Sequence, residues 1–358
     1  MIWQFIDSGS IGGAERHIQS ITKALTDLGL PTQVLLYQNH GVNPWLVQLA
    51  SANIKTLGLG GSFSDLLRTL AHSNCQLLHT HGYKAGILGR LAARLTGIPV
   101  VSTFHSGERP RSFPVGFYGW LDDWTSFLGK RIAVSEAIQE RLPFAAIHIR
   151  NFVSTPVCAP TDPLPRLVAF VGRLSEEKGP ETFCALARNS PPGLQWHIWG
   201  DGPLRARLES EYSGTVCFQG IATQMESVWP SVGLLVMPSQ YEGLPLAALE
   251  AQAAGVPVLA SRVGDVPLAV RHGVTGWLFQ QGNFNEARAH LTSWCDLRTS
   301  EQLLLRRSCW SHVRENYSED VELPKLLAVY ADAGLNLRGL HVKGQRDGQA
   351  TRSHSRCP

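Results

Sequence analysis

Several signatures of common enzyme classes are missing from this sequence. The chain has neither a G-x-G-x-x-G segment nor a P-loop, which counts against dehydrogenases and NTPases. It has no G-x-S-x-G, so an α/β-hydrolase nucleophile is not indicated. No D-x-D occurs, so a metal bound between paired aspartates is unsupported. The 7 cysteines form no C-x-x-C pair and are odd in number, which favours reduced thiols over a disulfide framework or a zinc site.

Net charge and long hydrophobic runs are also scarce. The 32 Lys+Arg and 29 Asp+Glu leave a net charge of +3, too small to indicate nucleic acid as a partner. No apolar run reaches the roughly 20 residues that span a membrane. The first residues, "IWQFIDSGS", lack the basic start of a signal peptide. We therefore expect a cytoplasmic protein.

The sequence does contain a long alternation of short apolar runs and helical patterns. Its 358 residues favour two domains of roughly 150 residues each. The alternation is typical of βαβ units around a parallel sheet, and continuously apolar runs are typical of strands covered on both faces. In the first half, strands are expected at residues 2–7, 32–38, 75–81, 100–105 and 131–135.

A second series of the same kind follows the proline-rich segment 154–166, which we interpret as an interdomain linker. Its strands are expected at 167–172, 196–200, 216–220, 234–239, 257–261 and 276–279. Two terminal helices follow, and the polar tail 338–358 is predicted to be disordered.

The predicted fold class is therefore α/β, with two Rossmann-like domains in tandem, at 1–155 and 164–316. Ligands of such sheets bind beyond the carboxyl ends of the strands, which places the expected site in a cleft between the domains.

Glycines follow the first predicted strand. Gly9, Gly12 and Gly13 precede a helix, where free backbone N–H groups and the positive helix end favour a phosphate. Many turns of this kind hold glycine for steric reasons alone, so this loop does not by itself indicate a ligand.

Two cations follow the strand expected at 167–172. Arg173 and Lys178 could neutralise a diphosphate, the arginine as a fork and the lysine as a point charge. Because Glu176 and Glu177 lie between them, an ordinary solvated charge run is the alternative.

Two glutamates lie in the stretch "YEGLPLAALEAQAAG". If a helix begins near Pro245, Glu242 lies in the loop before it and Glu250 about one and a half turns inside, so the two address different parts of one elongated ligand. A carboxylate accepts two hydrogen bonds, which suits a ribose or a sugar ring. The N–H groups of Gly243 and Leu244 are placed to bind phosphate. The alternative is that both glutamates are solvent-exposed and bind no ligand, but the apolar surroundings of Glu250 disfavour this alternative.

Histidines occur at strand ends of the first half. His105 is predicted to point into the cleft and to donate a hydrogen bond to a sugar hydroxyl or to developing negative charge. His79 and His81 are interpreted as structural.

The loop and helix after His105 combine basic and aromatic residues. This mixture suits a lipid-linked acceptor or an anionic membrane surface, although a helix packed on the sheet is an equal alternative. The residues concerned are Arg109, Arg111, Phe113, Phe117, Tyr118, Trp120 and Trp124.

Together these motifs resemble a known family. The segments "FVGRLSEEKG", "IWGDGPLRARLE", "CFQG", "MPSQYEGLPLAALEAQAAGVPVLAS" and "GVTGWLF" are similar to the second half of a retaining glycosyltransferase of family 4 (glycosyl transferases group 1). The first half has "GGAERH", "HTHGYKAGILGR", "STFH" and "IAVSEAI" in the expected order. The resemblance implies the GT-B fold, with an acceptor domain and a donor domain facing each other across the cleft. It also implies a helix at about 317–335 that crosses back to the first domain.

The resemblance further implies that the cleft binds a nucleoside diphosphate sugar and needs no cofactor or metal. Arg173 and Lys178 would grip the diphosphate, and Glu250 the ribose. Glu242 would hold the transferred sugar, helped by the backbone amides of Gly243, Leu244 and Pro245.

In the first domain, Gly12 and Gly13 would close over the phosphates, and His105 would contact the sugar near the reacting carbon. The resemblance thus makes His105, Arg173, Lys178 and Glu242 the catalytic residues.

The activity implied is retaining transfer of a hexose to an acceptor hydroxyl, in the assembly of a cell-surface polysaccharide, lipopolysaccharide or glycolipid. The acceptor would be a glycan or a lipid-linked glycan, and the protein would lie at the inner face of the cell membrane. Two alternatives remain: a nucleotide-sugar binding protein without activity, and a phosphorylase or epimerase with a similar fold.

Overall fold

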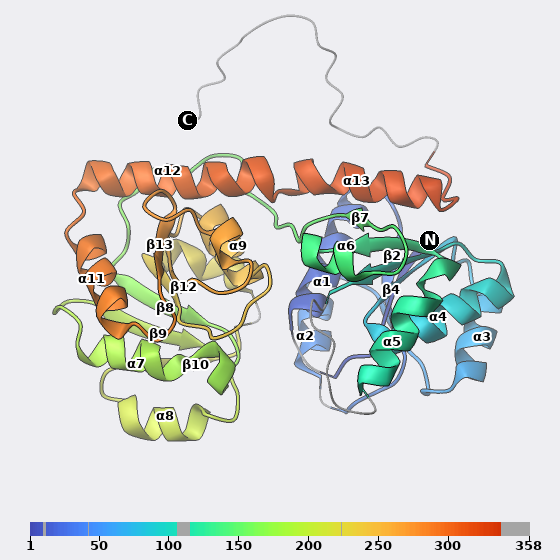
Figure 1. The fold of residues 1–358 in the computed structure, drawn as a ribbon, viewed down its shortest axis with the longest axis horizontal. Helices are drawn as coiled ribbons and strands as arrows, with labels where there is room; N and C mark the ends of the chain where they lie inside the picture. The colour runs from blue at the N-terminus through green and yellow to red at the C-terminus, as the bar shows by residue number, and fades with distance from the viewer. Residues whose placement is uncertain (10–11, 42, 106–114, 223, 338–358) are drawn as a thin grey trace, which may run out of the picture. The chain divides into compact units, whose positions relative to one another are not determined.

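The computed structural model describes residues 1–9, 12–41, 43–105, 115–222 and 224–337 (Figure 1). The chain divides into two α/β units. Unit 1 comprises Met1–Asn151 and the segment that begins at Glu319, and unit 2 comprises Phe152–Ser318. Each unit is built on a parallel sheet, which confirms the predicted α/β fold class. The predicted disordered tail, 338–358, lies outside the described residues.

The sheet of unit 1 has the order β3-β2-β1-β4-β5-β6-β7, and its described strand pairs are all parallel. Its strands are β1 (Ile2–Ile6), β2 (Thr32–Leu36), β3 (Thr56–Gly58), β4 (Leu77–His81), β5 (Val100–Phe104), β6 (Lys130–Ala133) and β7 (Ile147–His148). Five of these match the predicted strands. The sequence did not predict β3 and β7, because β3 is exposed throughout and β7 has only 2 residues.

Helices cover both faces of this sheet (Figure 1). Ile6, Val34 and Leu36 pack with α1 (Gly13–Asp27) and α2 (Pro44–Ser51). On the other face, Phe5, Leu35 and Leu78 pack with α3 (Phe63–Ala71) and α4 (Tyr83–Thr96). This alternation follows from the two-residue period of a strand. The remaining helices of the unit are α5 (Val115–Thr125), η1 (Ser126–Leu128), α6 (Glu136–Arg141) and α13 (Glu319–Asp332).

The sheet of unit 2 has the order β10-β9-β8-β11-β12-β13 and is also parallel. Its strands are β8 (Leu167–Val171), β9 (Gln195–Trp199), β10 (Cys217–Gly220), β11 (Leu234–Met237), β12 (Val258–Ser261) and β13 (Gly276–Phe279), each within one or two residues of its predicted bounds. Its helical segments are η2 (Glu176–Lys178), α7 (Pro180–Arg188), α8 (Arg205–Tyr212), η3 (Met225–Ser227), η4 (Trp229–Ser231), α9 (Leu246–Ala253), α10 (Val266–Ala269), α11 (Phe284–Cys295) and α12 (Thr299–Asn316).

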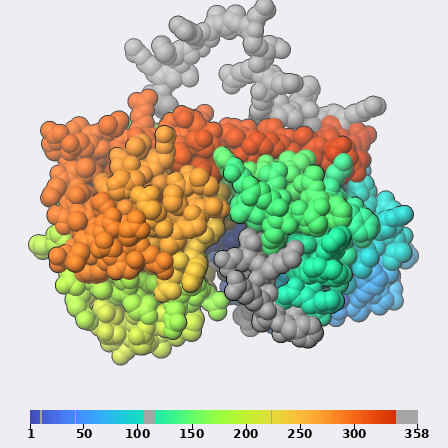
Figure 2. Space-filling view, viewed as in Figure 1, coloured from blue at the N-terminus to red at the C-terminus, as the bar shows by residue number. Residues whose placement is uncertain are grey.

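The proline-rich segment 154–166 is attached to helix α12, which lies at the surface of unit 2 (orange-red in Figure 2). Trp310 donates from Nε1 to the carbonyl of Pro156 at 2.9 Å, and Arg306 donates from Nη1 to the carbonyl of Pro163 at 3.0 Å. Val153, just before the segment, forms a parallel bridge with Ser318. The chain therefore enters and leaves unit 2 side by side.

Cysteines differ in one respect from the expectation of reduced thiols. Five of them are free, namely Cys75, Cys184, Cys217, Cys295 and Cys309. Cys158, in contrast, is disulfide-bonded. It is exposed on the irregular segment before β8, where a thiol can be reached by a partner, whereas Cys184 and Cys309 are buried.

A buried arginine joins helices α4 and α5 in unit 1. Arg90 has no exposed side-chain surface, and its Nη2 lies 2.6 Å from Oδ1 of Asp122. The same nitrogen donates to Thr125 at 2.7 Å, and Nη1 donates to Ser102 at 3.0 Å. Burial lowers the pKa of Arg90 and raises that of Asp122, and each charge offsets the shift of the other. Removing one partner leaves the other as an uncompensated buried charge.

We expect Arg90→Met to destabilise unit 1 by about 3–5 kcal/mol, because Asp122 is left buried without its cation. The measurement is the first thermal or urea unfolding transition of the full chain. Arg94→Met, on the same helix but exposed, is the matched control and should change stability by less than about 0.5 kcal/mol. Equal effects of the two substitutions would contradict the anchoring role of Arg90.

Candidate functional site

Two of the predicted site residues form an ion pair in unit 2. Lys178, the last residue of η2, places Nζ 2.7 Å from Oε1 of Glu242, in the loop after β11. The same oxygen accepts a hydrogen bond from Ser239 at 2.8 Å. The Glu242 side chain is 9% exposed and that of Lys178 is 29% exposed. The structure thus brings together two residues that are 64 positions apart in sequence.

Glycines hold these loops close to one another. A Cβ on Gly179, which has φ +64°, would lie 2.3 Å from the carbonyl oxygen of Pro238. A Cβ on Gly264, which has φ +48°, would lie 1.8 Å from the carbonyl oxygen of Glu242. Both distances are too short for any side chain, so glycine is required at both positions. The loop carrying Glu242 is therefore packed between the segments after β8 and β12.

Arg173 lies on the same edge of the sheet and is exposed. Between it and Lys178, the pKa of Glu177 is lowered, first by the hydrogen bond from Ser175 and then by the charges of Arg173 and Lys178. Glu176 is exposed. Of the two acids between the cations, Glu177 is therefore hydrogen-bonded to Ser175, and Glu176 faces solvent.

Helix α9 carries the second predicted glutamate. Its first residue is Leu246, one residue after the predicted start, and Pro245 is its buried N-cap. Glu250 lies in the second turn and is partly buried, as its apolar surroundings indicated. Gly243 and Leu244 precede the helix. One expectation is corrected here: Pro245 has no N–H, so it cannot donate to a ligand as the other two backbone groups can.

The glycine loop of unit 1 leads into α1 as predicted. Gly13 is the first helical residue, and Gly12 is its N-cap with an extended backbone. The first turn also holds a residue that the sequence analysis did not single out, Glu15, which is buried and bonded to Ser8 Oγ through Oε1 at 2.5 Å. A carboxylate therefore already occupies the positive end of this helix, where an anion is stabilised.

A second cluster missed from the sequence lies at the carboxyl edge of the same sheet. Asp7, just after β1, lies 2.6 Å from Nζ of Lys84 and 2.7 Å from Nε2 of His40 through its two carboxylate oxygens. Lys84 follows β4 and His40 follows β2. All three lie at or shortly beyond the carboxyl end of a strand, Lys84 in the first turn of α4, and this position is the signal that could have found them.

His105 belongs to a group of imidazoles next to this edge. Its ring lies 5.0 Å from that of His17 and 5.3 Å from that of His81. Burial lowers the pKa of His105 to about 4 and that of His79 to about 3. His79 and His81 are fully buried and hydrogen-bonded, in keeping with a structural role. At neutral pH these rings are therefore uncharged.

Aromatic side chains are exposed along helix α5 and beyond it. Phe117 is 51% exposed, Trp120 45% and Trp124 49%, and the ring centroids of Trp120 and Trp124 are 6.1 Å apart. Tyr118 and Phe127 are exposed as well. We call Phe117, Tyr118, Trp120, Trp124 and Phe127 the aromatic patch. The predicted members Arg109, Arg111 and Phe113 lie outside the described residues.

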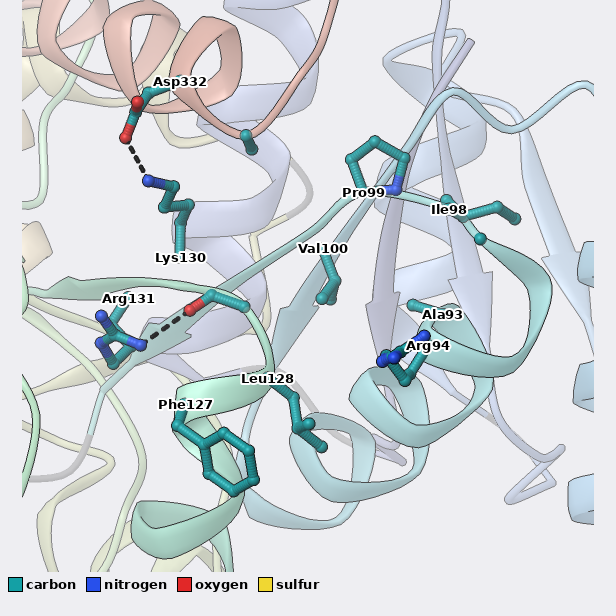
Figure 3. Close-up of a pocket in the computed structure, with 13 residues that line it drawn as sticks. Ala93, Arg94, Ile98, Pro99, Val100, Phe127, Leu128, Lys130, Arg131 and Asp332 are labelled. Atoms are coloured by element: carbon teal, nitrogen blue, oxygen red, sulfur yellow. Dashed lines mark hydrogen bonds and ion pairs between the residues drawn. The ribbon is translucent and has the colours of Figure 1, made fainter.

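A cavity of about 510 Å³ in unit 1 is lined by none of the predicted site residues, although Phe127 of the aromatic patch contributes to its wall (Figure 3). It is lined at the amino ends of β5 and β6 by Val100 and Lys130, and by the end of α4. Figure 3 shows Lys130 directed at Asp332 of α13, with which it forms an ion pair, and Arg131 bonded to the carbonyl of Gly129. Ligands of parallel sheets bind at the carboxyl edge, so this cavity is a poor candidate for the predicted site.

Among the described residues, no group of three or more His, Cys, Asp or Glu side chains is placed to hold a metal ion. Nor does this part of the chain include a helix that is both long and apolar enough to cross a membrane.

Comparison with known proteins assigns both halves of the chain. Residues 11–144 match the model "Glycosyltransferase Family 4", and residues 165–295 match "Glycosyl transferases group 1". The UDP-Gal:alpha-D-GlcNAc-diphosphoundecaprenol alpha-1,3-galactosyltransferase of Escherichia coli is 24% identical over 339 residues, which cover 84% of this chain and 86% of that protein. A D-inositol 3-phosphate glycosyltransferase of Pseudarthrobacter chlorophenolicus is 26% identical over 349 residues, 81% of each chain.

Solved structures agree in fold. HepE of Anabaena, in complex with UDP-glucose, matches with a TM-score of 0.77 at 18% identity, over 92% of this chain and 99% of that one. A sucrose-phosphate synthase of Thermosynechococcus elongatus matches with a TM-score of 0.73 at 18% identity, over 92% and 98% of the two chains. With a parallel-sheet α/β unit in each half and a family model matched to each, the chain belongs to glycosyltransferase family 4 and has the GT-B fold.

Proposed function

We propose that this protein is a retaining, metal-independent glycosyltransferase that moves a hexose from a nucleoside diphosphate sugar to an acceptor hydroxyl. The observation that carries the proposal is the 2.7 Å ion pair between Lys178 and Glu242 at the carboxyl edge of the unit 2 sheet. One of these residues was expected to bind the diphosphate and the other the transferred sugar. The relative named for UDP-Gal and the structure titled with UDP-glucose support a nucleotide-sugar donor.

On this proposal the donor rearranges the ion pair. A diphosphate carries more charge than the single carboxylate of Glu242, so it competes for Lys178 as well as for Arg173. Glu242 then keeps its bond from Ser239 and gains free lone pairs that accept from sugar hydroxyls. Glu250 binds the ribose. It lies in the second turn of α9, whereas Glu242 lies before the helix, so the two carboxylates reach different parts of an elongated donor.

Catalysis then depends on stabilising the departing diphosphate. Arg173 and Lys178 offset the negative charge that develops as the glycosidic bond breaks. The leaving phosphate itself accepts the proton of the acceptor hydroxyl on the same face of the sugar, which retains the anomeric configuration. No enzymatic nucleophile is needed on this route, in contrast to glycosidases that use two carboxylates.

We further propose that the acceptor is a glycan or a lipid-linked glycan of a cell-surface polysaccharide, lipopolysaccharide or glycolipid. The Escherichia coli relative is named for a diphosphoundecaprenol-linked acceptor. A solved structure with a TM-score of 0.64, titled a lipopolysaccharide outer core galactosyltransferase, shares the fold. A lipid-linked acceptor would be met at the inner face of the membrane, and the aromatic patch supports peripheral binding there, because aromatic rings favour the boundary between water and lipid.

The first prediction concerns the donor. A panel of UDP-, GDP- and ADP-sugars and free nucleotides should contain one member that raises the unfolding temperature of the protein. At 100 times its Kd, a ligand stabilises the native state by about 2.7 kcal/mol. Glu250→Ala should weaken this shift, and Glu226→Ala, an exposed glutamate of the same unit, should not. No shift with any member of the panel would contradict the nucleotide-sugar donor and would favour a phosphorylase.

The second prediction concerns turnover. Lys178→Ala should lower kcat on the order of 10²–10³-fold, since it removes one donor to the developing charge. Transfer is measured in the presence of EDTA, because metal independence is part of the proposal. Arg207→Ala removes an exposed cation of unit 2 and should leave kcat unchanged. Wild-type turnover in Lys178→Ala would refute the catalytic role of Lys178. Loss of activity of the wild-type protein in EDTA would refute metal independence.

The third prediction concerns the membrane. The protein should sediment with vesicles that contain anionic lipid at low salt and less at high salt, because charges near the surface are screened. The double variant Trp120→Ala and Trp124→Ala should sediment several-fold less. Leu304→Ala, which removes an apolar side chain that is 67% exposed in unit 2, is the control. Equal sedimentation of all three proteins would exclude the aromatic patch as the binding surface.

A further inference from the structure

A chain of hydrogen bonds crosses the centre of unit 1. It links strands β1, β4 and β5 to helix α13 through polar side chains that lie in or next to the buried core. In order along the chain of bonds, they are Thr103, His79, Tyr330, Gln4, His81 and His105.

The first half of this chain lies between β5 and α13. His79 Nε2 is 2.7 Å from the hydroxyl oxygen of Thr103, and His79 Nδ1 is 2.8 Å from the hydroxyl of Tyr330. The same hydroxyl lies 3.3 Å from Nε2 of Gln4. Tyr330 and Gln4 have no exposed surface, so water does not compete for these bonds.

The second half runs from Gln4 to the predicted site. Gln4 Oε1 is 2.8 Å from His81 Nε2, and His81 Nδ1 is 3.0 Å from His105 Nε2. In the part of the chain that the structure describes, no residue forms a hydrogen bond with the other ring nitrogen of His105, Nδ1. His105 is only partly buried. The chain of bonds therefore ends at one nitrogen of His105 and leaves the second for a ligand.

Each imidazole in this chain of hydrogen bonds carries a proton on only one of its two ring nitrogens. Burial lowers the pKa of all three rings, to about 3 for His79, to about 4 for His105 and well below the ordinary value for His81. A neutral imidazole has one donor and one acceptor nitrogen. The direction of one hydrogen bond therefore fixes the direction of the next. We call this common donor-to-acceptor direction the polarity of the chain of hydrogen bonds.

The orientation of the Gln4 amide determines that polarity. Its oxygen can only accept, so His81 must donate from Nε2 and must accept at Nδ1 from His105 Nε2–H. In the other direction the Gln4 NH₂ donates to Tyr330, whose hydroxyl donates to His79 Nδ1. All three histidines then carry their proton on Nε2.

The opposite polarity is disfavoured by the intrinsic chemistry of imidazole. Turning the Gln4 amide around would place the proton on Nδ1 in all three rings. The Nε2–H tautomer is the more stable form of a neutral histidine side chain, so the reversed chain would adopt the less stable form three times. Because the bonds are coupled, these three preferences add up in one direction.

We propose that Gln4 and Tyr330 are positioning residues that fix the Nε2–H tautomer of His81 and, through it, of His105. His105 then presents the lone pair of Nδ1 and accepts a hydrogen bond from a sugar hydroxyl. The sequence predicts that His105 donates a hydrogen bond to the ligand, and this proposal reverses that role. The identity of the ligand rests on the proposed function, whereas the tautomer does not.

The test is the tautomeric state of the ring nitrogens in the full-length protein, measured by NMR after labelling histidine with ¹⁵N. The signals of two of the 13 histidines are assigned from the spectra of His81→Asn and His105→Asn. Both rings should be neutral and protonated at Nε2. A proton on Nδ1 of His105, or an even mixture of tautomers, would overturn the inference.

Variants of the positioning residues test the cause. Gln4→Met removes the acceptor for His81 Nε2–H and should make both tautomers of His105 appear. Tyr330→Phe is the milder change, because it removes only one hydroxyl, and should produce the same mixture to a smaller extent. The control Tyr317→Phe removes a buried hydroxyl that bonds to Leu268 in unit 2 at 2.7 Å and should leave His105 unchanged. If His105 kept one tautomer in both Gln4→Met and Tyr330→Phe, the positioning role would be refuted.

Activity provides a second measurement. Gln4→Met should lower kcat/KM by about tenfold, the size expected for one lost hydrogen bond. Tyr317→Phe should not lower it. If the wild-type protein shows no sugar transfer, the proposed function fails while the tautomer result still decides the inference. If transfer is normal and His105 is protonated on Nδ1, only the inference fails.

Discussion

The parallel direction of the strands is the constraint on which the candidate site depends. When all strands of a sheet point the same way, the residues that follow them gather at one edge. In unit 2 this places Arg173 after β8, Glu242 after β11 and Gly264 after β12 on the same side. In unit 1 it does the same for Asp7 and His105. Side chains far apart in sequence thus come together without any local sequence signal for their contact.

Within unit 2, close backbone packing at the carboxyl edge of the sheet shields the ion pair between Lys178 and Glu242. Without this packing the pair would contribute little to stability. An exposed pair of long side chains loses its gain to solvent and side-chain entropy. Here Gly179 and Gly264 let the neighbouring loops approach to within contact of Pro238 and Glu242. The carboxylate of Glu242 is largely shielded, while Lys178 keeps partial access to water. A lysine held in this way is pre-organised for an anion and still reachable by one.

The sequence predicted the elements that are defined by burial, and much less of what depends on contacts. The eleven predicted strands are present, and most of them are short, largely buried runs, whereas β3 is exposed throughout. The glutamates could be placed relative to α9 from helix geometry alone. The positions of Asp7, Lys84 and His40 near strand ends can be read from the sequence, but their bonds to one another could not be predicted, because strand order decides which strand ends lie close together. The disulfide at Cys158 likewise has no signal in cysteine spacing.

The two units offer different chemistry to a ligand, and the difference follows from burial. Near β8 and β11 the cations remain partly exposed to water, and in the proposed function they bind a diphosphate. In unit 1 the imidazoles are packed with ring centroids as close as 4.2 Å, where positive charges would lose hydration and, as a smaller effect, repel one another. They are neutral for that reason. Neutral imidazoles bind a ligand through hydrogen bonds of defined direction rather than through charge, and a sugar hydroxyl can meet either direction because it both donates and accepts.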